Sequence, residues 1–243
     1  FSCQIGNGNQ ICAITNLKTV TDFRSLNTAF NGQGAPLVPI GDQLLFNNYD
    51  ACLNLGGIAN ISYNYNNPII AGDINFANMS SNYLAEKMGF PFDKNGHLAK
   101  KGELNNDLIL KLNALSFFNK PFPKSLSIED FKKWYLPVLS KSNCSLYDQL
   151  FTTGFHLAES IKKITGEKRK LLVTGGGVHN QFWIQKLKEF NVQVVIPEST
   201  LIEYKEALIF SLLGVLKVRD EVNCLSSVTG ATRDLKSGII FTP

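Results

Sequence analysis

The sequence lacks the long apolar run that a membrane helix requires. Its longest strongly apolar stretch without a charge, ALIFSLLGVL (207–216), is well short of the roughly 20 residues that span a bilayer. We therefore expect a buried helix there. The chain also lacks a block of like charge, because its 24 basic and 20 acidic residues are spread along the sequence. Charge therefore identifies neither a nucleic acid nor a membrane surface as a partner.

Cysteine pairs and histidine clusters are missing as well. The five cysteines are scattered without a CxxC pair, which fits a reducing cytosol and predicts a cytoplasmic protein. His97, His156 and His179 lie far apart, so a histidine metal site would need the fold to gather them. The chain begins at Phe1, without methionine or a signal-peptide pattern, inside a strand-like run. We expect that another segment precedes it.

What the sequence does contain is typical of a globular protein. Apolar residues make up 44% of 243 residues, enough for an ordinary packed core. Residues 1–20 alternate short β-like runs (FSCQI, QICAI, KTV) with glycine and asparagine, which predicts a hairpin. A loop-rich passage follows over 21–46 and indicates a site or a hinge. Residues 48–73 then predict a meander of three antiparallel strands, and the best domain boundary lies near 47–48.

The second half predicts helices and a parallel sheet. Helical spacing is present over 78–88, ended by Gly89, and over 145–165, ended by Gly166. LLVTGGGVHNQFWIQKLKEF followed by VQVVIP reads as strand, glycine turn, helix and strand. A last long helix over 203–222 carries an apolar belt that predicts a mostly buried face: Ala207, Leu208, Phe210, Leu212, Leu213 and Leu216. The fold class is therefore α/β, with a mixed sheet and helices for both faces.

Two glycine clusters are candidate binding elements. Gly175, Gly176 and Gly177 follow a strand and precede a helix, where backbone amides can bind an anion or a nucleotide, although a tight strand-to-helix turn is the simpler alternative. Gly56 and Gly57 connect two strands and can be a plain hairpin turn. The same turn also lets amides approach a phosphate, with Asn54 and Asn60 beside it as short donors. No Walker A sequence is present.

Three acidic residues are candidates for chemistry. Asp22 stands at a strand end beside a flexible loop, as a base for phosphoryl transfer to a hydroxyl would, but an ion pair with Arg24 or a turn role is an equal alternative. Asp73 could hold magnesium through water or cap the next helix. Glu206 lies on a strongly apolar helix, near buried surface or simply on the exposed polar face.

Six segments together resemble one family, the anhydro-N-acetylmuramic acid kinases, which are sugar kinases of the actin, sugar kinase and Hsp70 superfamily. The segments occur in the family's order and roughly at its spacing: QIGNGNQI, VTDFRSLNTAFNGQGAPLVP, NLGGIANIS, LLVTGGGVHN, YKEALIF and LSSVTGATRD. The resemblance implies an RNase H-like fold of two domains with ATP between them. Residues 1–47 would be a remnant of the first, sugar-side domain, and 48–243 the second, nucleotide-binding domain, with the last residues returning to the first.

The resemblance also implies roles for individual residues. Asp22 would be the catalytic residue, activating a water that opens the 1,6-anhydro ring while O6 attacks the γ-phosphate. The products would be N-acetylmuramate 6-phosphate and ADP, in the recycling of cell-wall peptidoglycan. The expected sugar-binding residues are Arg24, Gln33, Gly34 and Glu206. The resemblance implies ATP and Mg²⁺ as cofactors, without indicating the ligands of the metal. The expected residues for ATP are Asn54, Gly56, Gly57, Asn60, Asp73, Asn78, Gly175, Gly176, Gly177 and Asn180. The expected partners are an amino sugar and ATP, with a homodimer left open.

The chain departs from the family pattern in three places. No MSGTSxDG-like phosphate loop precedes Phe1, so we expect little turnover from this chain alone. Asp73-Ile-Asn-Phe-Ala-Asn78 replaces the usual Asp-Thr-Gly-Pro-Gly-Asn, which would put Phe76 close to a phosphate, and Asn27 stands where an acid is expected. The alternative reading is an Hsp70-fold nucleotide-binding or chaperone-like module, or an inactive kinase relative.

Overall fold

The computed structural model describes residues 6–63 and 68–243. The chain forms two compact units. Unit 1 contains Phe1–Asn47, Asn66–Ile70 and Tyr204–Pro243, and unit 2 contains Asn48–Tyr65 and Ala71–Glu203. The first division therefore falls between residues 47 and 48, whereas the whole segment from Tyr204 onward groups with the N-terminal residues instead of with unit 2.

Unit 2 is built on a five-stranded sheet in the order β4-β3-β2-β5-β6. β2 pairs antiparallel with β3 and parallel with β5, which pairs parallel with β6. The strands are β2 (Ala51–Leu55), β3 (Ile58–Tyr63), β4 (Ile70–Phe76), β5 (Lys170–Thr174) and β6 (Gln193–Val195). The predicted α/β class and mixed sheet are confirmed. The Asn66-Asn67-Pro68 turn lies mostly outside the described residues.

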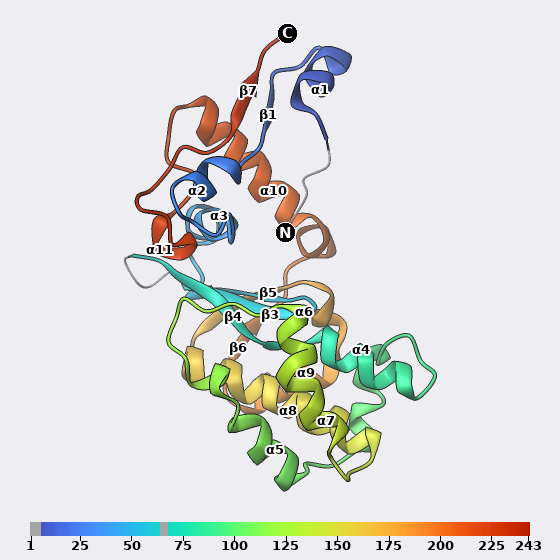
Figure 1. Ribbon diagram of the computed structural model, residues 1–243. Helices are drawn as coiled ribbons and strands as arrows, with labels where there is room; N and C mark the ends of the chain where they lie inside the picture. The colour runs from blue at the N-terminus through green and yellow to red at the C-terminus, as the bar shows by residue number, and fades with distance from the viewer. Residues whose placement is uncertain (1–5, 64–67) are drawn as a thin grey trace. The chain divides into compact units, whose positions relative to one another are not determined.

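Unit 2 also contains three of the longer helices of the protein. They are α4 (Asn78–Lys87), α8 (Leu146–Thr165) and α9 (Gln181–Glu189), and Figure 1 shows them below the sheet. The Ser145 side chain caps α8 by accepting from the Asp148 amide, and Gly166 ends that helix. The order of meander, helix, strand and helix that the resemblance implies is thus present in this unit.

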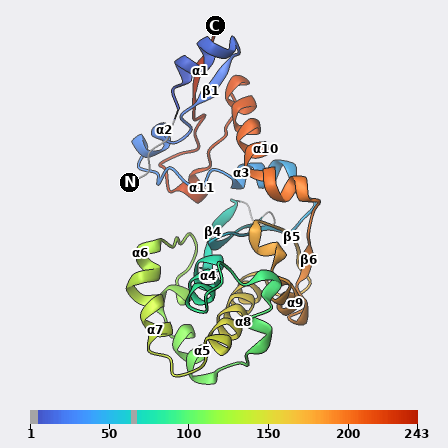
Figure 2. The same cartoon turned by 90° about the vertical axis from the view of Figure 1, so that its right-hand side faces the viewer.

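Short helices between α4 and α8 wrap one side of unit 2 (Figure 2). They are η1 (Lys94–Gly96), η2 (Ala99–Lys101), α5 (Asn106–Asn113), η3 (Ser116–Asn119), α6 (Ile128–Asp130), the π-helix η4 (Phe131–Tyr135) and α7 (Leu136–Ser140). A capping box between Ser127 and Asp130 starts α6. The rings of Phe131, Trp134 and Tyr135 then pack against Phe76 of β4, with centroids 4.8–5.4 Å away. This aromatic cluster joins these helices to β4.

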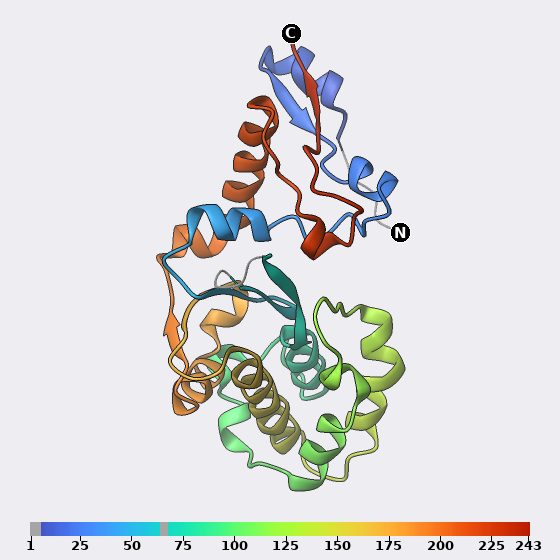
Figure 3. The same cartoon turned by 90° about the vertical axis from the view of Figure 1, so that its left-hand side faces the viewer.

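Unit 1 has less regular structure. Its elements are α1 (Gly8–Thr15), β1 (Thr19–Thr21), α2 (Ser25–Ala29), α3 (Pro39–Leu45), α11 (Ser226–Thr229) and β7 (Ile239–Phe241), together with α10 (Ser199–Val218) from Tyr204 onward. Figure 3 shows β1 and β7 side by side, and they pair antiparallel as a two-stranded sheet. At Gly41 the helices α3 and α10 approach so closely that a Cβ would collide with Ile209.

The hairpin predicted over residues 1–20 is wrong in its second strand. QICAI belongs to α1, because the Asn7 side chain accepts from the amides of Asn9 and Gln10 and so caps a helix. Asn16, in the left-handed conformation at φ 53°, ends that helix. The run KTV does contribute to β1, whereas FSCQI lies outside the described residues.

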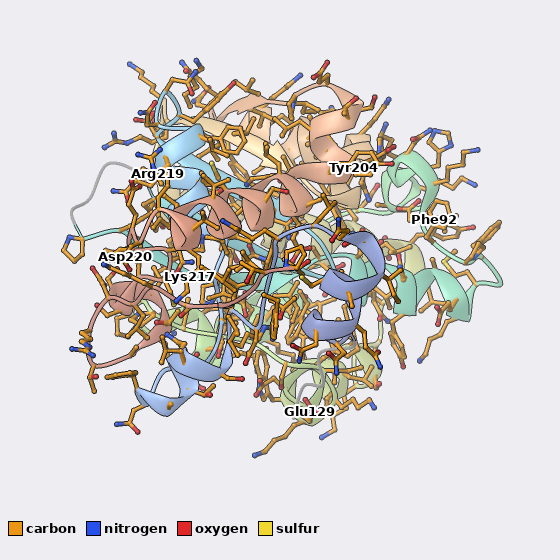
Figure 4. All side chains as sticks on the ribbon, turned by 90° about the horizontal axis from the view of Figure 1, so that it is seen from above. Phe92, Glu129, Tyr204, Lys217, Arg219 and Asp220 are labelled. Carbon is orange, nitrogen blue, oxygen red and sulfur yellow. The ribbon has the colours of Figure 1, made fainter. Side chains whose placement is uncertain are left out.

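The apolar belt of α10 is less buried than predicted. Ile209, Leu213 and Leu216 are buried, but Ala207 is exposed and Leu208 is 45% exposed. Tyr204 lies near one end of the helix and Lys217, Arg219 and Asp220 lie at the other (Figure 4). Across the described residues, no helix is long and apolar enough to cross a membrane.

Candidate functional site

In unit 2, one edge of the sheet gathers most of the predicted nucleotide-site residues. β2 and β5 are parallel, so their carboxyl ends, Leu55 and Thr174, lie at the same edge. The Gly56-Gly57 turn follows β2 and the triple glycine follows β5. Ligands of open α/β sheets bind outside the carboxyl ends of the strands. We call the two glycine turns and the asparagines beside them the glycine edge; its residues are Asn54, Gly56, Gly57, Asn60, Asn78, Gly175, Gly176 and Gly177.

Asn54 connects the two turns of the glycine edge. It lies directly opposite Asn60 in the antiparallel register and beside Thr174 in the parallel one. A Cβ on Gly175 would collide with the Asn54 side chain and with Leu55, and φ of Gly175 is +84°, so both space and backbone conformation require glycine there. The register therefore packs the triple-glycine turn against the end of β2.

The Gly56-Gly57 turn is a hairpin turn whose carbonyl groups are already bonded. The Gly57 carbonyl accepts from the amides of Ala77 and Met79 at 3.0 Å, and the Gly56 carbonyl accepts from the Asn78 amide at 3.1 Å. The Asn78 side chain also donates to the Leu55 carbonyl at 3.3 Å. The first amides of α4 are thus used to hold this turn.

Unlike these carbonyl groups, the backbone amides of the glycines have no backbone partner among the described residues. Over residues 6–63 and 68–243, those of Gly56, Gly57 and Gly176 donate to no other backbone group. Gly57 and Gly176 are exposed, and a Cβ on either would meet nothing within 4 Å. Successive unbonded amides beside open space form the kind of concavity that binds an anion.

Two predicted nucleotide-site residues lie apart from this group. Asn180 is buried at 7% exposure and caps α9, accepting from the Trp183 amide. Asp73 lies within β4 rather than at its end, since the strand continues to Phe76. It does not cap α4, whose N-cap is Ala77. Its carboxylate accepts from the Leu126 amide at 2.7 Å, and burial raises its pKa.

The printed bonds of Asp73 lead away from the glycine edge. Its amide donates to the Lys124 carbonyl at 2.8 Å, and its carboxylate accepts from the Leu126 amide at 2.7 Å. Asn75, two residues later in β4, bonds His156 and Ser160 of α8. Within the described residues, no bond joins Asp73 to the Gly56-Gly57 turn or to the triple glycine.

For Asp73 two roles were left open, magnesium binding through water and capping of α4. The structure excludes the cap, because the N-cap of α4 is Ala77. The carboxylate is bonded to the Leu126 amide, and burial raises its pKa, so its surroundings disfavour the charge that a direct magnesium ligand carries. Among the described residues, no group of three or more His, Cys, Asp or Glu side chains could hold a metal ion.

The expectation that Phe76 lies near a phosphate does not hold either. Its ring is 1% exposed and packs in the aromatic cluster with Phe131, Trp134 and Tyr135. The ring therefore points into the core, and replacing the usual glycine with Phe76 leaves the glycine edge open.

In unit 1, Asp22 has a turn role that keeps one oxygen available. Its Oδ1 accepts from the Ser25 amide at 3.1 Å and the Ser25 hydroxyl at 2.7 Å, which holds the start of α2. Asp22 is half-buried and left-handed at φ 57°, a conformation that is uncommon outside glycine and that recurs at functional sites. Among the described residues, Oδ2 has no hydrogen-bond donor. The alternative of an ion pair with Arg24 is not realised within those residues.

The predicted sugar loop folds against α2 and α11. Gly34 is buried and left-handed at φ +71°, its would-be Cβ 3.6 Å from the Arg24 side chain. The Gln33 amide donates to the Thr229 carbonyl at 2.9 Å, and the Gln33 residue itself is exposed. Asp22, Arg24, Gln33 and Gly34 thus belong to one local structure.

Glu206 does not join the loop residues through any described contact. It is exposed on α10, as the simpler alternative predicted, while its neighbour Lys205 is the buried residue. Lys205 pairs with Asp42 at 2.7 Å, with side chains 9% and 5% exposed. The sequence analysis missed this pair because the two residues are far apart along the chain.

The fold is that of an α/β protein with two glycine turns whose amides are open beside the sheet and, in its other unit, the Asp22 carboxylate beside the Gly32–Gly34 loop. The family model of anhydro-N-acetylmuramic acid kinase matches residues 1–243. The chain therefore belongs to the anhydro-N-acetylmuramic acid kinase family.

Individual relatives agree with this assignment. The anhydro-N-acetylmuramic acid kinase of Aliivibrio fischeri is 33% identical over 99% of this chain and 70% of its own length. That of Pasteurella multocida is 36% identical over 99% of this chain and 68% of its own. A solved structure, the activator of the 2-hydroxyisocaproyl-CoA dehydratase from Clostridium difficile with bound ADPNP, covers 72% of this chain and 63% of its own at 14% identity and a TM-score of 0.42. That likeness is too low to identify a ligand.

Proposed function

We propose that this protein is an ATP-dependent kinase that converts 1,6-anhydro-N-acetylmuramic acid to N-acetylmuramate 6-phosphate. The match of the family model to the whole chain carries the proposal. The unbonded amides of the glycine edge support it, because they offer donors to phosphate oxygens. The Asp22 loop supports it too, because a module that only binds nucleotides has no need of a sugar-side base.

In this proposal Asp22 is the general base. Its Oδ2 accepts a proton from water, and the oxygen of that water bonds to C1 of the sugar. The C1–O6 bond breaks, and O6 bonds to the γ-phosphorus of ATP while the bond from phosphorus to the departing ADP oxygen breaks. The two hydrogen bonds from Ser25 to Oδ1 keep the carboxylate oriented throughout.

The glycine edge would bind the nucleotide. Amides of Gly56, Gly57 and Gly176 would donate to phosphate oxygens, while the bonds from α4 to the Gly56 and Gly57 carbonyls fix the turn. Asn54 and Asn60 would add side-chain donors from the same face of the sheet. Magnesium would accompany ATP, as is usual in kinases, but this chain's ligands for it are not assigned.

The test is phosphate transfer from ATP to a panel of amino sugars, with Asp22→Asn as the variant. We expect transfer to the anhydro sugar to fall by about 10²–10⁴-fold because the base is lost. The dissociation constant of ATP should stay unchanged. Asp130→Asn is the matched control, since Asp130 accepts from the Ser127 amide and hydroxyl in the same way but lies on α6.

Near-normal transfer by Asp22→Asn would remove Asp22 from the role of base. ATP binding without transfer to any sugar in the panel would favour the alternative, a nucleotide-binding module or an inactive relative.

A further inference from the structure

The buried side chain of Asn27 is hydrogen-bonded through both its amide nitrogen and its amide oxygen. It lies in α2 and is 0% exposed. Its Nδ2 donates to the Thr229 hydroxyl at 2.9 Å and to the Cys224 sulfur at 3.2 Å, and its Oδ1 accepts from the Gly34 amide at 2.7 Å. The side chain therefore uses both of its donor hydrogens and its acceptor inside the protein.

These bonds join two segments that are about 200 residues apart in the sequence. On one side is the 32–34 loop, where a Cβ on Gly32 would collide with the Asn27 side chain. On the other is α11, and the Gln33 amide donates to the Thr229 carbonyl at 2.9 Å. The loop is thus held at Gly34 by the Asn27 side chain and at Gln33 by the Thr229 carbonyl.

The same side chain is linked to Asp22 through α2. Asp22 holds the start of this five-residue helix through Ser25, and Asn27 holds its buried face. A shift of Asn27 would therefore move the loop and the helix that carries the Asp22 partner together.

In this chain an amide stands where the family pattern has an acid, and the bonds of its present arrangement need that amide. The Thr229 hydroxyl donates its only hydrogen to the Leu225 carbonyl at 2.8 Å, so it can only accept from residue 27. A carboxylate at residue 27 could still accept from Gly34 but could donate to neither Thr229 nor Cys224. The network is fully satisfied only with asparagine in its present arrangement.

We propose that Asn27 is a positioning residue for the sugar. It holds the 32–34 loop on α11, so that Gln33 and the Asp22 carboxylate are presented to the substrate in one fixed arrangement. This rests on the proposed function, because it assigns the loop to the sugar. Its effect is on sugar binding and orientation and not on ATP.

The experiment compares Asn27→Asp with Asn223→Asp. Asn223 is the matched control because it is also in unit 1, 1% exposed and triply bonded, to the Leu213 carbonyl and to the Ser237 carbonyl and amide. Both variants lose buried donors, so both should lower thermal stability. Only Asn27→Asp should raise the KM for the anhydro sugar, by about tenfold for the loss of a hydrogen bond, with the KM for ATP unchanged.

A second variant changes the hydrogen-bond partner of Asn27 instead of Asn27 itself. Thr229→Val keeps the shape of Thr229 and removes the acceptor for Nδ2. It should also raise the sugar KM. Amide hydrogen exchange at Gly34, measured by NMR without any ligand, should become faster in Asn27→Asp and in Thr229→Val but not in Asn223→Asp.

Two results would overturn the proposal. One is a sugar KM that stays unchanged in Asn27→Asp and in Thr229→Val. The other is an equal rise of the sugar KM in Asn223→Asp, which would mean that the rise follows from a general loss of stability. If the unaltered protein transfers phosphate to no sugar, the proposed function fails first, and the positioning role fails with it even when Gly34 exchange responds as expected.

Discussion

Unit 1 and unit 2 hold their structures by different means. In unit 2 an aromatic cluster around Phe76 and the five-stranded sheet form a broad apolar core. Unit 1 has a two-stranded sheet of three-residue strands, and Ile14 and Leu17 are 85% and 65% exposed. An isolated two-stranded sheet is marginally stable. Unit 1 instead places buried polar groups at its joints.

These polar joints are Asn27, Asn223 and the Lys205–Asp42 pair. Asn27 and the Lys205–Asp42 pair connect the N-terminal segment to the C-terminal one, whereas Asn223 connects the end of α10 to the nearby Ser237. Polar bonds fix direction more strictly than apolar contacts, and a buried polar group that loses its partner is strongly destabilising. The comparison therefore teaches that single polar contacts have a larger share in unit 1, whereas unit 2, which also buries polar groups such as Asn75 and His156, has in addition a broad apolar core.

The largest effect should come from the core of unit 2. Phe76→Ala should lower the free energy of unfolding by about 4 kcal/mol, because it leaves a cavity among three rings. Both tryptophans, Trp134 and Trp183, lie in unit 2, so tryptophan fluorescence during urea unfolding reports this unit. Phe92→Ala is the control: Phe92 is 52% exposed and its loss should change little. An equal effect of the two variants would contradict the aromatic core.

A somewhat smaller effect should come from the buried ion pair of unit 1. Lys205→Met removes the cation that lies 2.7 Å from the buried Asp42 carboxylate and should cost about 3 kcal/mol. Replacing both residues, with Lys205→Met and Asp42→Leu, should restore most of the stability. Hydrogen exchange of the α3 and α10 amides measures the change. If the double variant is no more stable than the single one, the charge pair is not what joins these helices.

The smallest effect, taken over a single pH unit, is a pH dependence of the free energy of unfolding that belongs to unit 2. Burial, with a smaller effect of Lys163, lowers the pKa of His156 to about 3. Below pH 6.5 the unfolded chain takes up a proton that the folded protein does not, so unfolding becomes easier as the pH falls from 6.5 toward 3. The slope should approach about 1.4 kcal/mol per pH unit from this group.

His156→Gln should flatten that slope, since glutamine offers an acceptor to Asn75 but does not titrate. The exposed His97 provides the control, because His97→Gln should leave the slope as it is. Urea unfolding followed by tryptophan fluorescence at several pH values gives the measurement. An unaltered slope in His156→Gln would exclude this histidine as its source.

Periodicity and capping residues determined much of the fold from the sequence alone. The meander, α4, α8 and the β5-turn-α9-β6 order follow from alternation, helical spacing and glycines at element ends. The strand predicted for QICAI was wrong because the helix cap at Asn7 outweighed the β-like composition of the segment. The residues of the glycine edge could be predicted because they follow strands directly.

Only the tertiary structure decided what the side chains face. Asp73 bonds the Leu126 amide and Phe76 packs in the aromatic cluster, and local sequence does not fix which segments cover a strand. Asn27, Cys224 and Thr229 form a network across about 200 residues that no local pattern shows. The sequence by itself determined the α/β class, the family and the glycine turns, because these depend on local periodicity and on motifs. The tertiary structure decided which polar groups are bonded and which remain available for a ligand, because that depends on contacts between distant segments.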